Sequence, residues 1–209
     1  MNKSTIISIL VLITTFAISF YFYPQLPERL ASHWNARGEV DGYSSKAFGL
    51  FLIPVMSLAL FSLLSLVPKI DPLKKNIESF RKYYDLFILL FLLFFLYIHL
   101  IIILWGLDIR VDMNMALLPA FVILFYFVGV LIEHSKRNWF IGIRTPWTLS
   151  SDIVWDKTHK LGGILFKAGA IVSAFGLFFP DYVILFILFP AVVSAIYPVI
   201  YSYFVFRKQ

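Results

Sequence analysis

The stretch that decides the fold is residues 86–107, which read LFILLFLLFFLYIHLIIILWGL. It contains no Asp, Glu, Lys or Arg over its whole length. An α-helix rises about 1.5 Å per residue, so about 20 apolar residues cross a hydrocarbon core of about 30 Å. This segment therefore predicts a helix that spans a membrane.

Five further apolar runs have the same character, at residues 6–23, 48–67, 115–132, 162–179 and 183–206. The composition agrees, since 60% of the 209 residues are hydrophobic and 14% are charged, against about 45–50% and 25% in soluble domains. No small-residue cleavage site follows the first run, so we interpret it as a retained span and not as a signal peptide. The sequence predicts an all-α, polytopic membrane helix bundle with six transmembrane helices.

The orientation follows from the Lys and Arg residues, which concentrate in alternate loops and after the last span. These residues are Lys69, Lys74, Lys75, Arg81, Lys82, Lys136, Arg137, Arg144, Lys157, Lys160, Arg207 and Lys208. Cytoplasmic loops carry an excess of positive charge. The pattern therefore predicts that both termini lie in the cytosol (N-in/C-in), that the first loop faces outside and that the fourth loop faces the cytosol.

The predicted outer loop, residues 24–47, combines a proline-bounded exit from the first span with turn signals around Gly38 and Gly42. A turn can bring its polar residues together, and we name them as effector-binding candidates: His33, Trp34, Asn35, Glu39 and Asp41. One alternative is a compact loop with Trp34 at the membrane interface. Another is a divalent cation on His33, Glu39 and Asp41, although their spacing matches no established metal motif. We predict no metal and no cofactor.

The predicted cytosolic loop, residues 134–161, holds three tryptophans. Ser150 or Ser151 can cap a helix that begins at Asp152 and runs directly into the fifth span. Such a helix places Trp155 and His159 on one face. The loop is either an amphipathic interfacial segment or a docking surface for signalling. The docking candidates are Asn138, Gly142, Arg144, Thr145, Pro146, Trp147, Trp155 and His159.

Three ionisable residues lie inside or at the ends of spans, where polar groups are costly and often functional. His99 is expected to form a hydrogen bond across the bundle. Lys167 either extends to the headgroups or pairs with Glu133, and the extended arrangement is slightly favoured.

The two loops resemble those of the SdpI family of bacterial immunity and signalling proteins. Chains of that family begin with a small domain of unknown function that carries a His-Trp-Asn…Gly…Asp-Gly loop, here between Leu26 and Lys46. Their second signature is here the run from Asn138 through Gly142-Ile143-Arg144-Thr145-Pro146-Trp147 to Trp155 and His159. The resemblance covers essentially the whole chain. It implies an N-terminal two-helix unit, residues 1–67, and a four-helix unit, residues 68–209.

In the best-known members of that family, the protein protects its producer from a secreted killing peptide and holds a soluble DNA-binding repressor at the membrane. The resemblance therefore implies a multi-pass immunity and signalling protein of the cell membrane. Its expected partners are the lipid bilayer, a toxin peptide or other effector outside, and a repressor inside. Direct nucleic-acid binding is not expected, because the basic residues divide among separate loops beside the bilayer.

Two other functions remain open. A small-solute or ion transporter is compatible with six spans, although no inverted repeat is visible. A membrane-embedded enzyme would have to use His33 with Glu39 or Asp41, because the chain has no cysteine and no His-Glu-x-x-His motif. We expect a protein that is not an enzyme.

Overall fold

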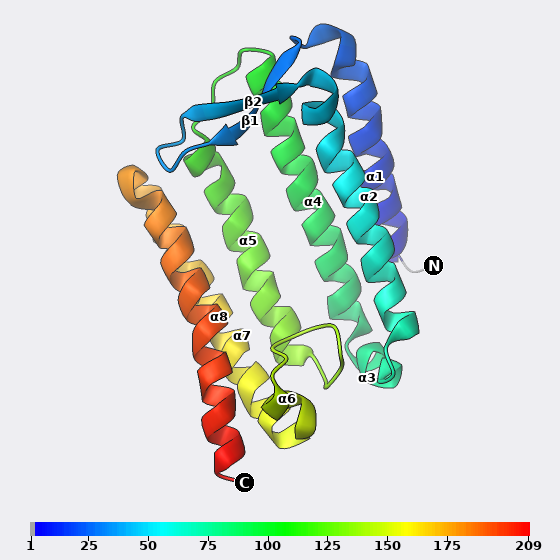
Figure 1. Cartoon of the computed structure of the whole chain (residues 1–209), viewed down its shortest axis with the longest axis vertical. Coiled ribbons are helices and arrows are strands. Elements are labelled where there is room, and N and C mark those ends of the chain that lie inside the picture. The colour runs from blue at the N-terminus through cyan, green and yellow to red at the C-terminus, as the bar shows by residue number, and fades with distance from the viewer. Residues whose placement is uncertain (1–2) are drawn as a thin grey trace.

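The computed structural model describes residues 3–209, and six of its helices are long and apolar enough to cross a membrane (Figure 1). These helices confirm the six predicted spans. The elements in chain order are α1 (Lys3–Phe22), η1 (Tyr23–Gln25), β1 (Arg29–Trp34), β2 (Val40–Ser45), α2 (Lys46–Ile70), α3 (Lys74–Ser79), α4 (Arg81–Gly106), α5 (Met113–His134), α6 (Pro146–Ser150), α7 (Asp152–Ala174), η2 (Phe175–Phe178), η3 (Pro180–Tyr182) and α8 (Val183–Arg207).

Side-chain caps fix where the spanning helices begin. Ser45 accepts a hydrogen bond from the N–H of Phe48 at the start of α2, and Asp112 accepts one from Met115 at the start of α5. Ser151 does the same for α7, which begins at Asp152 as predicted and continues into the fifth span. Each cap satisfies one N–H that has no partner inside the helix.

The helices pack with α4 near the middle of the bundle. α4 contacts α1 and α2 on one side and α5 on the other, and α7 packs between α5 and α8. Gly129 of α5 and Gly163 of α7 face each other, and a Cβ on Gly129 would lie 2.8 Å from the carbonyl oxygen of Gly163. The two helices are therefore in close contact, as small residues permit in membranes.

The division of the chain into an N-terminal unit, residues 1–67, and a second unit, residues 68–209, remains a prediction.

Large apolar side chains cover the outside of the bundle, as a lipid environment requires. Phe189 of α8 is 70% exposed, Phe20 of α1 is 66% exposed and Ile123 of α5 is 60% exposed. A soluble protein rarely exposes so much contiguous apolar surface. The chain is a multi-pass membrane protein.

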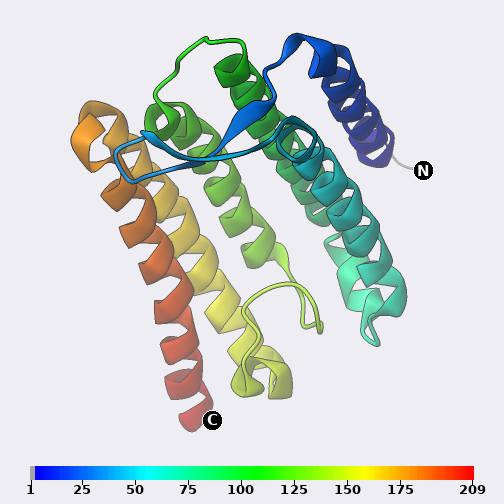
Figure 2. The ribbon, with the colours of Figure 1, turned by 45° about the horizontal axis from the view of Figure 1, so that its top comes forward.

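The predicted all-α helix bundle is confirmed, and the first loop adds an antiparallel β-hairpin of β1 and β2 that the sequence did not predict. Leu30 and Ala31 of β1 are buried against the bundle, so this strand has an apolar anchor that stabilises the pair. Figures 1 and 2 show the hairpin crossing one end of the bundle, from the α1–α2 side toward α5 and α8. The C-terminus, α3 and α6 lie at the other end.

The orientation of the bundle remains a prediction, and reporter fusions test it. A reporter that is active only in the cytosol should be active after Gln209 and silent when fused at Arg37. The reason is the excess of Lys and Arg at the end opposite the hairpin. An active fusion at Arg37 would invert the assignment of the two faces.

Candidate functional site

The hairpin tip is organised by one side chain, that of Asn35. Its Oδ1 accepts hydrogen bonds from the N–H groups of Arg37 (2.9 Å) and Glu39 (3.1 Å), and its Nδ2 donates to Glu39 Oε2 (2.9 Å). Arg37 also pairs with this carboxylate at 3.1 Å. The hydrogen bond from Asn35 and the charge of Arg37 hold the pKa of Glu39 below its ordinary value. The tip therefore presents an ionised carboxylate at neutral pH.

The other predicted outer residues lie on the strands behind the tip. His33 Nδ1 and Asp41 Oδ1 are 2.5 Å apart on an exposed surface, and Trp34 packs edge-on against Trp105 with 5.7 Å between ring centroids. The five residues thus form two separate polar pairs and one aromatic contact. Within residues 3–209, no three His, Asp or Glu side chains converge as a metal site would need.

The hairpin is fixed to the bundle by residues that the sequence did not single out. Asn114, in the first turn of α5, donates from Nδ2 to the carbonyl oxygen of Ala36 at the tip (2.9 Å). At the end of α4, Gly106 leaves room for Leu26 and Leu30, and a Cβ there would lie 2.5 Å from Leu26 Cδ2. The hairpin is therefore attached to both α4 and α5.

At the opposite end lies the Arg-Thr-Pro-Trp loop, which we define as residues 135–151. Asn138 is fully buried and satisfies its amide within the loop. Its Oδ1 accepts from the N–H groups of Phe140 (2.9 Å) and Ile141 (2.6 Å), and its Nδ2 donates to the carbonyls of Lys136 (2.8 Å) and Ile141 (2.9 Å). Asn138 therefore shapes the loop and is not accessible to a partner.

Two residues near α3, which lie outside this loop in the sequence, form hydrogen bonds with its backbone. Neither is among the predicted site residues. The carboxylate of Asp71, which is buried at the end of α2, accepts from the N–H of Trp139 (2.9 Å) and from that of Leu73 (2.6 Å). Asn76 of α3 donates to the carbonyl oxygen of Arg137 (2.7 Å). In the sequence, Asp71 and Pro72 follow an apolar run and indicate a turn. This pattern does not identify Trp139 as the partner of Asp71.

The threonine and proline of the loop form a cap for α6. Thr145 Oγ1 accepts from the N–H of Thr148 (3.1 Å), while Thr148 Oγ1 accepts from the N–H of Thr145 (2.8 Å). Pro146 occupies the first helical position, where its missing N–H costs nothing. Thr145 Oγ1 also lies 3.1 Å from Ser202 Oγ of α8. Thr145 and Thr148 therefore form a capping box, and the contact of Thr145 with Ser202 links the loop to the last spanning helix.

Trp155 and His159 share one face of α7 as predicted, but that face is buried. Both side chains are at most 1% exposed, and their rings stack with 3.9 Å between centroids. His159 Nδ1 donates to the carbonyl of Trp155 (2.8 Å), and its Nε2 accepts from the N–H of Ile143 (2.9 Å), so the imidazole is neutral. We therefore correct the docking role of these two residues, because a cytosolic partner cannot reach them in this conformation.

Arg144 and Trp147 remain on the surface of the loop but do not stack on each other. The Trp147 ring packs against Tyr203 of α8 with 5.1 Å between centroids. The exposed Arg144 donates from Nη1 to the carbonyl of Trp139 (2.7 Å). Gly142, with φ of +109°, turns the chain between Ile141 and Ile143 so that the backbone lies against His159.

The three ionisable residues that were predicted to lie in or at the ends of spans each have a partner. His99 is fully buried, and its Nε2 lies 2.9 Å from Ser19 Oγ of α1, which confirms the predicted hydrogen bond across the bundle. Lys167 Nζ lies 2.7 Å from Glu133 Oε2. The favoured arrangement, in which Lys167 extends to the headgroups, is therefore wrong. The close contact of α5 and α7 at Gly129 and Gly163 brings the two charges together.

We expect Lys167→Met or Glu133→Gln alone to lower the free energy of unfolding by about 1–3 kcal/mol, because each strands a charge that is only partly solvated. The exposed fractions of the side chains, 24% for Lys167 and 31% for Glu133, place the effect below that of a fully buried pair. The double variant should recover at least half of the loss. Denaturation in detergent measures this cycle.

The matched control is the exposed pair Lys136–Asp156, whose nitrogen and oxygen are 3.2 Å apart and whose side chains are more than half exposed. Its single variants should change the free energy of unfolding by less than about 1 kcal/mol. If Glu133→Gln and Lys167→Met lowered the free energy of unfolding additively, and by no more than the control variants, the Lys167–Glu133 ion pair would have no energetic role.

Family models match the two regions of the chain that contain the hairpin and the Arg-Thr-Pro-Trp loop. A model described as "Domain of unknown function (DUF1648)" matches residues 10–58, and a model of the SdpI/YfhL protein family matches residues 135–202. "Immunity protein SdpI" of Bacillus subtilis (strain 168) is 26% identical over 208 residues, which are 99% of this chain and 97% of that protein. No solved structure matches the chain. With both signature regions matched in order and a relative aligned over almost its full length, the chain is similar to the SdpI family from end to end.

Proposed function

We propose that this chain is a membrane immunity protein that binds a toxic peptide or other effector at its hairpin and passes the bound state to the Arg-Thr-Pro-Trp loop. The observation that carries the proposal is the alignment of almost the whole chain with Immunity protein SdpI. The two matched family regions contain the hairpin and the loop, which hold the densest polar networks outside the spans.

The hairpin has the surface chemistry that a peptide ligand requires. It presents charges of both signs at Arg37–Glu39 and a hydrogen-bonded pair at His33–Asp41, and the exposed ring of Tyr43 lies on the second strand. Polar pairs of this kind give register and orientation to a bound chain, and an aromatic side chain supplies contact area. The hairpin is thus suited to contact a peptide outside the bilayer.

Helix α5 joins the two ends of the proposed relay. Its first turn holds the hairpin tip through Asn114, and its last residue, His134, is followed directly by the Arg-Thr-Pro-Trp loop. A helix of 22 residues is about 33 Å long, so α5 is a continuous helical connection between the hairpin tip and the loop. A displacement of the hairpin could therefore be passed to the loop, whose exposed residues include Trp139, Arg144 and Pro146 and are available to a soluble repressor. The proposal assigns no catalytic step to the chain.

The outward half of the proposal is tested by survival of a sensitive bacterium that makes this chain and is challenged with the killing peptide. We expect protection, and we expect the double variant His33→Ala, Asp41→Ala to lose at least about tenfold in peptide affinity, because it removes a pair of polar contact groups. Asp181→Asn is the control, since this exposed acidic residue lies near the same end but outside the hairpin. Protection and peptide binding that survive the double variant would overturn the hairpin site.

The inward half is tested by Arg144→Lys. Lysine keeps the charge but lacks the planar fork of donors, so recruitment of a tagged soluble repressor to the membrane should fall while the protein accumulates normally. Membrane abundance, melting temperature and recruitment are measured on the same variant. Unchanged recruitment would remove Arg144 from the docking surface.

A further inference from the structure

A cavity of about 520 Å³ lies next to the Arg-Thr-Pro-Trp loop and shares only Arg144 with the proposed docking residues. Its walls come from five spanning helices, with Leu64 of α2, Phe87 of α4, Val128 of α5, Phe166 of α7 and Val199 of α8 among them. Gly142, Ile143 and Arg144 form its end at the loop. Figure 1 shows α2 and α8 on the two sides of the α4–α5 pair, where they flank this region. The volume falls in the range of about 300–1,000 Å³ that small ligands occupy.

Arg144 is the charged group of this cavity. Its guanidinium donates to the carbonyl of Trp139 and, within residues 3–209, forms no ion pair with a carboxylate. The nearby hydroxyl of Tyr84 is already used, because it donates to the carbonyl of Leu64 (2.7 Å). The cavity therefore combines apolar walls with one cation whose remaining donors have no anionic partner.

The neighbours of Arg144 indicate its depth in the membrane. Trp139 is 52% exposed and Phe140 is 39% exposed, although both are large aromatic residues at the end of a spanning bundle. Exposed aromatic side chains gather at the level of the lipid headgroups. The cation therefore lies at headgroup depth, while the cavity extends from it toward the hydrocarbon core.

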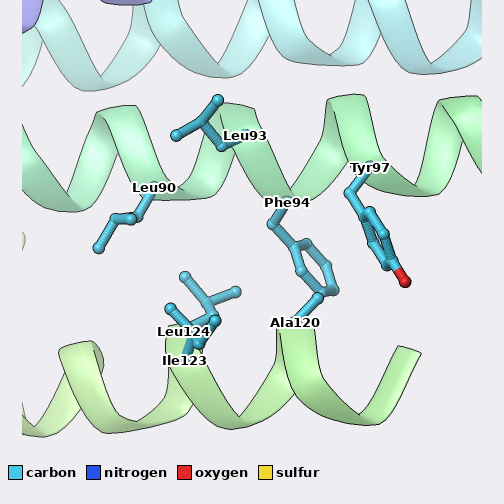
Figure 3. Close-up of a pocket in the computed structure, with 7 residues that line it drawn as sticks. All are labelled: Leu90, Leu93, Phe94, Tyr97, Ala120, Ile123 and Leu124. Atoms are coloured by element: carbon cyan, nitrogen blue, oxygen red, sulfur yellow. The ribbon is translucent and has the colours of Figure 1, made fainter. Parts of the chain in front are cut away.

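A second crevice, between α4 and α5, serves as a comparison (Figure 3). Its volume is about 210 Å³ and its seven lining residues are apolar except Tyr97, whose hydroxyl donates to the carbonyl of Ala116 (2.8 Å). This crevice has no charged group that could orient a ligand. Of these two sites, the cavity at Arg144 is the one that has both an apolar part and a charged part, as an amphiphile site needs.

We propose that the cavity binds one phospholipid with an anionic headgroup, with its phosphate on the guanidinium of Arg144 and an acyl chain between α2, α4, α5 and α8. Charge complementarity selects the anionic head, because the guanidinium fork matches phosphate oxygens. The apolar walls select the chain. This inference goes beyond the proposed function and requires neither the toxic peptide nor the repressor.

Native mass spectrometry of the purified full chain in detergent, with phosphatidylglycerol or phosphatidylcholine added, tests the site. We expect one phosphatidylglycerol to be retained at least about fivefold better than phosphatidylcholine, because one basic residue at a membrane surface attracts an anionic lipid by about this factor. Arg144→Gln should remove this preference. Ala195→Phe, which fills the cavity from α8, should weaken the retention of both lipids.

Arg207→Gln is the matched control, because Arg207 also forms no ion pair with a carboxylate in the described part of the chain, lies at the same end and is over the Tyr203 ring outside the cavity. It should keep the preference for phosphatidylglycerol. Melting temperatures show which variants remain folded, and Ala195→Phe tests the site if Arg144→Gln unfolds. Equal retention of the two lipids by the wild-type protein, or a preference that survives both Arg144→Gln and Ala195→Phe, would overturn the proposal. Displacement of the lipid by excess inorganic phosphate would also overturn it, because the acyl chain would then contribute nothing.

Discussion

Gly142→Ala should unfold the Arg-Thr-Pro-Trp loop and lower the free energy of unfolding by about 2–5 kcal/mol. The backbone φ of Gly142 is +109°, which costs an L-residue about 1–2 kcal/mol. The added Cβ would also collide with His159 Nε2 and approach the Trp155 ring, both of which are buried and cannot move aside. The hydrogen bond from the N–H of Ile143 to His159 would then be lost as well. Chemical denaturation in detergent measures the effect.

Gly38→Ala is the control that separates backbone strain from collision. Gly38 also has a positive φ, +76°, but a Cβ there would have ordinary contacts, 3.5 Å or more from Asn114 and Asp112. It should lower the free energy of unfolding by about 1–2 kcal/mol, the cost of the backbone alone. If both glycine variants lose the same amount, the close contact between Gly142 and His159 has no energetic weight.

The membrane architecture could be predicted because it depends on local composition. Each apolar run must form a helix to satisfy its backbone in lipid, so the spans follow from the sequence alone. The start of α7 at Asp152 was also predictable, because Ser151 caps its own helix and needs no distant partner. The hairpin was missed because its strands are short and are stabilised by Leu30 and Ala31 packing on the bundle.

The polar contacts of the candidate site depended on distances between helices, which the sequence does not contain. Lys167 and Glu133 were recognised as possible partners, but their pairing requires the close approach that Gly129 and Gly163 allow. Likewise, helical spacing placed Trp155 and His159 on one face without showing which way that face points. Asp71 was missed because its partner, the N–H of Trp139, is 68 residues away in the chain.

Trp155→Ala is expected to destabilise the whole bundle by about 3–5 kcal/mol, and not to act as a selective loss of docking. The side chain is fully buried, it stacks on His159, and its Nε1 donates to the carbonyl of Ser135 (2.9 Å). Truncation to Ala would leave a cavity where α7 meets the loop and an unpaired carbonyl beside it. The free energy of unfolding in detergent and the amount of protein in the membrane should fall together.

Two variants divide this effect into its parts. Trp155→Phe keeps a ring against His159 but removes the Nε1 donor, so it should lose less, about 1–3 kcal/mol. Trp139→Ala is the matched control, because Trp139 belongs to the same loop but is 52% exposed, and it should change the free energy of unfolding by no more than about 0.5 kcal/mol. If Trp155→Ala instead left stability unchanged while recruitment of the repressor was lost, the ring would have to be accessible to a partner. The buried stack with His159 would then not be the conformation in which the loop signals.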